Sequence, residues 1–258
     1  MEPARQGRGP SLAIAGLGVA LAIGVRLAVL VLSAQAMAAL VAQVVLVEWG
    51  TARAGVVWSA VPASTTAILR RALPAAAIGL GLAASIVLLG AVTNGVDLER
   101  VPSVSVSLLA LGLVNAVLVA WRDELLLHGL AIRALGDASP PLARILACAA
   151  TSAAAAVGKG DTSPRAVVVA ALLGAILGAL WVRDRGAWQP FAAHVAFRFA
   201  AGPLLAGGIV QMRVAATTWG GADAGLLGGT LAVVALLPFA SAAVVLAGTK
   251  SFAGGEVR

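Results

Sequence analysis

Long apolar stretches separated by short polar segments dominate the chain. The apolar runs cover residues 11–25, 27–47, 73–92, 104–121, 142–158, 166–182, 189–210 and 225–247. A helix needs about 20 apolar residues to cross the hydrocarbon core of a bilayer, with about 17 as the lower limit. The pattern therefore predicts an all-α, polytopic transmembrane bundle of seven to eight spans. Only Arg26 separates the first two runs, which form either one long tilted helix or a re-entrant piece followed by a span.

Composition excludes the soluble classes of protein. Of the 258 residues, 60% are hydrophobic and 11% are charged, whereas a soluble domain has about 45–50% apolar and about 25% charged residues. So few polar groups would not cover the surface of a soluble enzyme, and so apolar a chain is not disordered. We expect one transmembrane domain over residues 11–247, between polar tails at 1–10 and 248–258, in the inner (plasma) membrane.

The net charge of +7 reflects membrane topology rather than nucleic-acid binding. The basic residues are scattered singly and form no stripe, so no nucleic-acid partner is expected. Cytoplasmic loops favour Lys and Arg. The segment 48–72 carries three arginines and one glutamate, whereas 97–100 carries two acids and one arginine. Alternation from these segments predicts a cytoplasmic C-terminus.

All six tryptophans lie near the ends of apolar runs, which is typical of anchors at the membrane interface. We therefore expect them to be anchors rather than a binding cage. They are Trp49, Trp58, Trp121, Trp181, Trp188 and Trp219.

Two groups of polar residues interrupt the apolar pattern. The first contains Asp123, Glu124 and His128, and the second contains His194 and Arg198. On a helix, Glu124 and His128 are i,i+4 neighbours, as are His194 and Arg198. The chain has two histidines, and each lies in one of the groups. Because a charged group near the bilayer centre costs about 2.5–3.5 kcal/mol, both groups are candidates for a functional site.

The adjacent carboxylates of Asp123 and Glu124 allow two interpretations. In a low-dielectric site they repel, so one favours its protonated form unless a cation intervenes, and such a group suits general base catalysis. The other interpretation is structural. Arg198 then pairs with Asp123 or Glu124 and ties two helices together, while each histidine bonds a backbone carbonyl.

The segment DELLLHGL resembles the first motif of the CPBP family of intramembrane proteases, which includes the type II CAAX prenyl endopeptidases. That motif reads Glu-Glu-x-x-x-Arg, usually followed by Gly. The corresponding positions in this chain are Asp123, Glu124, His128 and Gly129, with Asp in place of the first Glu and His in place of the Arg. A later family motif, His-x-x-x-Asn, corresponds to His194 and Arg198. The resemblance covers about residues 70–205. The middle motif, Phe-x-x-x-His, is missing from the end of the run 142–158.

The resemblance implies a role for each candidate residue. Asp123 is a base for the attacking water, and Glu124 orients and supports the site. His194 stabilises the oxyanion, and Arg198, at the Asn position, donates to the oxyanion or to a carboxylate. His128, at the Arg position, replaces the missing histidine as the second partner of the water.

Metal binding is a separate question. Two histidines and two carboxylates suit zinc, but Arg198 places a fixed positive charge one turn from His194. A metal-independent, glutamic-type mechanism without a cofactor is therefore expected. The single cysteine, Cys148, lies in an apolar run and forms no disulfide within the chain.

The leading hypothesis is an intramembrane endopeptidase, embedded in the lipid bilayer, that cleaves a membrane-anchored or lipidated protein or peptide near the membrane face. The family processes prenylated CAAX proteins, bacteriocin leaders or C-terminal sorting anchors such as those of the myxosortases; the Ala-, Gly- and Arg-rich composition favours a role in protein sorting. A second hypothesis is a catalytically inactive relative that acts as a membrane scaffold or binding partner. A third is a small proton-coupled transporter, although no internal repeat is visible.

Overall fold

A computed structural model describes residues 11–31, 35–59, 64–158, 163–205, 207–214 and 229–253. The expected tail 1–10, Trp219 and residues 254–258 of the expected C-terminal tail lie outside these ranges. The elements are α1 (Leu12–Val31), α2 (Ala36–Arg53), α3 (Thr65–Val92), β1 (Val96–Arg100), α4 (Val106–Asp123), η1 (Glu124–Gly129), α5 (Leu130–Leu135), α6 (Pro141–Gly158), α7 (Pro164–Asp184), α8 (Trp188–Phe199), η2 (Ala200–Leu204), β2 (Val210–Val214) and α9 (Thr230–Ala253).

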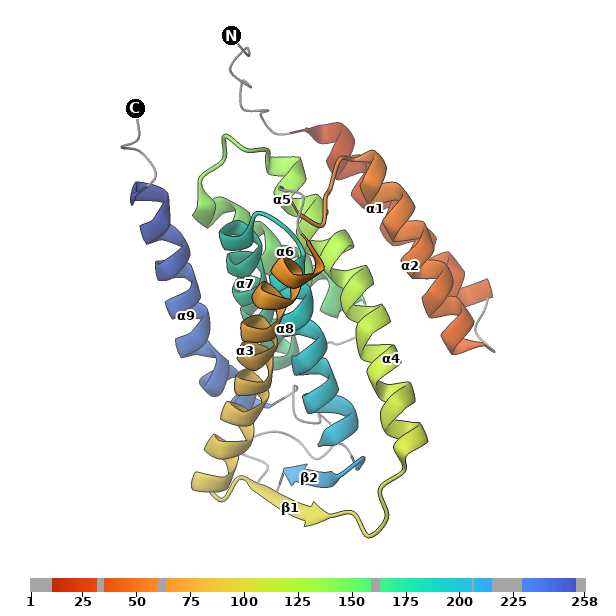
Figure 1. The fold of residues 1–258 in the computed structure, drawn as a ribbon, viewed down its shortest axis with the longest axis vertical. Helices are drawn as coiled ribbons and strands as arrows, with labels where there is room; N and C mark the ends of the chain where they lie inside the picture. The colour runs from red at the N-terminus through yellow and green to blue at the C-terminus, as the bar shows by residue number, and fades with distance from the viewer. Residues whose placement is uncertain are drawn as a thin grey trace.

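The helices run up and down a single bundle. The start of α1 and the end of α9 lie at the top of Figure 1, and the two strands lie at the bottom. Within the described ranges, seven helical segments are long and apolar enough to cross a membrane. They are α1, α2, α3, the continuous stretch 106–135, α6, α7 and α9. The predicted all-α, multi-pass architecture is therefore confirmed.

The first two apolar runs are divided differently from the prediction. Arg26 lies inside α1, which extends to Val31, and α2 begins at Ala36. The two helices pack side by side as a hairpin, so the prediction of one long tilted helix is wrong. Arginine is a good helix former, and its long side chain carries the charge away from the backbone, so Arg26 does not end a helix.

The run 189–210 is also not the long helix that the pattern predicts. Its α-helix, α8, has 12 residues and continues as the π-helix η2, which contains Pro203. Proline lacks an N–H donor and disfavours further helix, and the chain then enters β2. Since α8 packs against α3, α4 and α7, it is held among longer helices rather than by its own length.

A short antiparallel sheet lies at the end of the bundle opposite the start of α1 and the end of α9. Strand β1 pairs with β2, with Val96 opposite Val214 and Arg100 opposite Val210. The pairing joins the α3–α4 connection to the segment after η2 (Figure 1). The apolar pattern did not predict it, because β1 reads as a polar loop.

Helices α3 and α8 approach closely at a glycine. A Cβ placed on Gly79 would overlap the carbonyl oxygen of Ala193 and lie 3.0 Å from the backbone nitrogen of Phe197. Small residues allow such close approach of helix backbones in membranes. Because Ala193 directly precedes His194, Gly79 also sets where α8 presents that histidine.

We predict that Gly79→Ala lowers the free energy of unfolding by about 1–3 kcal/mol, because the added methyl group overpacks the α3–α8 contact. Gly81→Ala is the matched control on the same helix, since a Cβ there meets nothing within 4 Å, and it should leave stability equal or slightly higher. Thermal unfolding of both variants in the same detergent measures the difference. Equal loss in the two variants would contradict the prediction.

Candidate active site

The site is organised around the carboxylate of Glu124, whose residue is 0% exposed. Its Oε1 lies 2.8 Å from His194 Nδ1. Its Oε2 lies 2.8 Å from the indole nitrogen of Trp181 and 2.9 Å from His128 Nδ1. A carboxylate accepts hydrogen bonds and an indole donates. One buried charge is thus held by three donors that come from η1, α7 and α8.

A π-helical turn places Glu124 and His128 at this point. Helix α4 continues into η1, and the N–H of Leu130 donates to the carbonyl of Leu125, five residues earlier. π-Turns inside α-helices occur frequently at functional sites. The predicted proximity of Glu124 and His128 is confirmed by their hydrogen bond.

The second ring nitrogen of His128 faces helix α6. His128 Nε2 lies 3.0 Å from Ser152 Oγ. Ser152 belongs to the segment in which the family's middle histidine was expected and is missing. Helix α6 therefore contributes a hydroxyl group to the site, and His128 connects that hydroxyl to Glu124.

Asp123 is held by a different set of partners. The Nε and Nη2 atoms of Arg122 lie 2.7 Å and 2.6 Å from Asp123 Oδ1. Arg122 Nη1 in turn donates to Oε1 of the buried Gln43 on α2, at 2.7 Å. A cation thus stands beside the two adjacent carboxylates, which reduces their mutual repulsion.

Helix α8 brings the second polar group to the same place. Asp123 interacts electrostatically with both His194 and Arg198, so the five candidate residues gather in one site. His194 has an 11% exposed side chain, and within the described part of the chain its Nε2 has no hydrogen-bond partner. We expected each histidine to bond a backbone carbonyl. That expectation is wrong for the Nδ1 atoms, because the Nδ1 atom of each ring bonds Glu124 instead.

The tryptophans do not all behave as the predicted anchors. Trp49 fits that expectation, since it is exposed and Arg53 lies 3.7 Å over its ring. The expectation is wrong for Trp181, which is buried and donates to Glu124.

Three other tryptophans gather next to the site with Phe191. The ring of Trp58 lies 5.1 Å from that of Trp121 and 4.9 Å from that of Trp188. Phe191 lies 5.4 Å from Trp58 and is one helical turn before His194. Glu48 accepts hydrogen bonds from the indoles of Trp58 and Trp121. These four rings form a half-buried aromatic cluster.

Sequence reasoning missed four polar contributors: Gln43, Arg122, Ser152 and Trp181. Gln43 could have been found from the sequence, because an amide in the middle of an apolar run needs a polar partner. Ser152 stands among alanines and Trp181 stands near a run end, and neither position signals a contact with Glu124.

Among the described residues, no group of three or more His, Cys, Asp or Glu side chains is arranged to hold a metal ion. The metal-independent mechanism stays a prediction.

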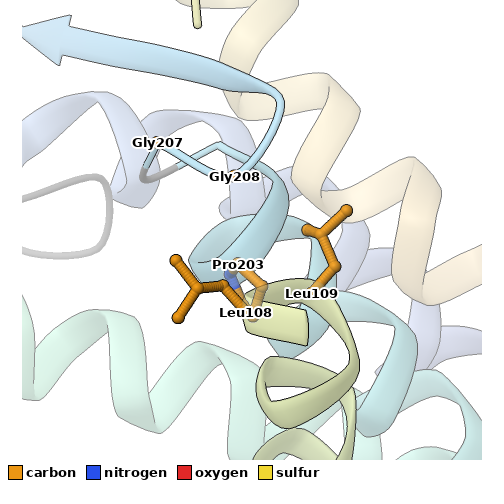
Figure 2. A pocket seen from close by; sticks show the side chains of 5 residues that line it. All are labelled: Leu108, Leu109, Pro203, Gly207 and Gly208. Atoms are coloured by element: carbon orange, nitrogen blue, oxygen red, sulfur yellow. The ribbon is translucent and has the colours of Figure 1, made fainter. Parts of the chain in front are cut away.

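A small cavity lies elsewhere in the bundle. Figure 2 shows Pro203 between Leu108 and Leu109 of α4, with Gly207 and Gly208 above them. Gly207 has a φ of +106°, a conformation that glycine adopts readily. The lining carries no titratable side chain, so this cavity offers no catalytic group.

The fold and the site define a multi-pass helical membrane protein with a buried carboxylate–histidine centre. The family model described as type II CAAX prenyl endopeptidase Rce1-like matches residues 105–200. This segment carries all five candidate site residues, and the match confirms the resemblance to the CPBP proteases predicted from sequence. The matched segment is narrower than the predicted 70–205. No curated protein and no solved structure matches the chain.

We predict that Glu124→Ala destabilises the protein by about 2–5 kcal/mol, because three buried donors lose their acceptor. Glu99→Ala is the control: its pair with Arg213 is 64% exposed on both sides, and such pairs contribute about 0–1 kcal/mol. Unfolding of the purified variants in detergent measures both changes. A Glu124→Ala protein as stable as Glu99→Ala would contradict the central role of this carboxylate.

Proposed function

We propose that the protein is an intramembrane endopeptidase of the glutamic type, which cleaves a membrane-anchored or lipidated protein with a water molecule activated at the Glu124 centre. The observation that carries the proposal is the buried Glu124 carboxylate between two histidines, within the segment that matches a protease family.

His194 is the proposed proton acceptor. Its Nδ1–H donates to Glu124, so the neutral ring presents a lone pair at Nε2. The water gives its proton to this nitrogen as its oxygen attacks the peptide carbonyl. Glu124 and the negative charge of Asp123 stabilise the imidazolium that forms. The proposal differs from the resemblance, which implies Asp123 as the base and His194 as the oxyanion donor.

Arg198 is the proposed donor to the oxyanion. It stands one turn from His194 on α8 and interacts electrostatically with Asp123. A guanidinium group stabilises the negative charge that develops on the carbonyl oxygen. The imidazolium of His194 then returns its proton to the leaving nitrogen, which completes hydrolysis.

The aromatic cluster supports an apolar substrate. Trp58, Trp121, Trp188 and Phe191 are half-buried, and the cluster includes residues of both site helices, α4 and α8. Aromatic rings offer large apolar contact areas at low conformational cost. We propose that these rings bind the membrane anchor of the substrate, with a protein-sorting role in the plasma membrane.

We predict that Glu124→Gln and His194→Gln each reduce processing by at least about 100-fold, the range for loss of a general base. The measurement is precursor accumulation in membrane proteomes of the native host, in a gene deletion complemented with each variant. Glu99→Gln, at an exposed site on β1, serves as the control and should process normally.

The same strains separate an enzyme from a catalytically inactive scaffold. The scaffold is favoured by the missing middle motif and by the engagement of Asp123 with Arg122. If both glutamine variants restore normal C-terminal processing of the substrate proteins in the deletion strain, the carboxylate and the histidine are not catalytic and the proposal fails. Precursors that accumulate, yet still co-purify with the Glu124→Gln protein, support the enzyme.

A further inference from the structure

The mechanism above uses His194, and it leaves the other histidine of the centre without a role. Ser152 Oγ lies 3.0 Å from His128 Nε2, and His128 Nδ1 lies 2.9 Å from Glu124 Oε2. Serine, histidine and carboxylate therefore stand in a row, with each ring nitrogen facing the group that it faces in serine hydrolases.

The direction of each hydrogen bond in this row follows from the one that Trp181 donates to Glu124. The indole of Trp181 only donates, and Glu124 accepts its N–H on the same oxygen that contacts His128. An ionised carboxylate can only accept hydrogen bonds, so Nδ1 of His128 carries the hydrogen and donates it to Glu124. The neutral ring then has its lone pair at Nε2, where it accepts the hydroxyl proton of Ser152. This polarity activates a serine for attack.

Two neighbouring helices hold Ser152 at this position. The adjacent Thr151 donates to the carbonyl of Leu127, at 2.7 Å, and ties α6 to η1. Gly174 of α7 lies against the serine, since a Cβ there would be 2.5 Å from Ser152 Oγ and 2.6 Å from the backbone carbonyl oxygen of Cys148. A larger residue at position 174 would displace α6, so the glycine permits the approach.

Ser152 is the accessible end of this row of three side chains. Glu124 and His128 are fully buried, whereas Ser152 is partly exposed. Helix α6 is little covered by the rest of the described chain, and its exposed leucines, Leu142 and Leu146, lie on the side of the helix away from Ser152. Exposed apolar side chains on a membrane helix such as α6 contact the lipid.

We propose that Ser152 is the nucleophile of a Ser152–His128–Glu124 triad that hydrolyses acyl esters dissolved in the bilayer. Ser152 Oγ bonds to the acyl carbon while its proton passes to His128 Nε2. The ester bond breaks, and the leaving alkoxide takes that proton to become the alcohol. Water then cleaves the acyl-serine, its proton passes through His128 to Ser152, and the carboxylic acid departs. This activity goes beyond the proposed peptide cleavage, although both use Glu124.

The test uses the full-length protein in lipid nanodiscs and an alkyl fluorophosphonate, which reacts with activated serines. Mass spectrometry of the wild-type protein should place the adduct on Ser152, a result that needs no variant. Ser152→Ala should abolish labelling, His128→Gln should slow it by at least about 100-fold, and hydrolysis of a p-nitrophenyl acyl ester should fall in parallel. Ser85→Ala is the control, because the Ser85 hydroxyl donates to the backbone carbonyl of Leu82 in its own helix α3, and it should label as the wild type does.

The outcomes separate this inference from the proposed protease. An unlabelled wild-type protein, an adduct on another residue, or equal labelling of His128→Gln and wild type overturns the triad. If peptide processing persists in such a protein, the protease proposal stands without it. Labelling of Ser152 together with ester hydrolysis supports the triad, whether or not any peptide is cleaved.

Discussion

The charge of Glu124 is the constraint on which the centre of the bundle depends. An ionised carboxylate removed from water is very unfavourable unless hydrogen bonds surround it. Here the donors come from η1, α7 and α8, so the three segments meet at one group. Satisfying the charge therefore fixes how these helices sit, and it orients both histidine rings at the same time.

The two rings use one carboxylate in different ways. Each binds Glu124 through Nδ1. Nε2 of His128 then faces Ser152, whereas Nε2 of His194 has no hydrogen-bond partner in the described part of the chain. A carboxylate that accepts a hydrogen bond from Nδ1 of a histidine orients the ring and fixes its tautomer. One charge can thus support chemistry on two sides, one served by water and one by a serine.

Close packing supplies the rest of the geometry. Gly79 lets α8 approach α3, and Gly174 lets α6 approach α7. The first contact positions the helix that carries His194, and the second positions the helix that carries Ser152, and side-chain hydrogen bonds tolerate little displacement. The Arg122–Gln43 contact extends the network to α2. The functional centre and the packing of the bundle are therefore one structure.

The sequence by itself determined the class of the protein and the identity of the five candidate residues. Apolar runs longer than a bilayer is thick have few alternatives to membrane helices, and charged residues within them need a reason to be there. The tertiary structure alone decided the break after Val31, the short α8, and the partners Ser152, Trp181 and Gln43. These contacts join segments far apart in the chain, and local pattern carries no information about which faces of two helices meet.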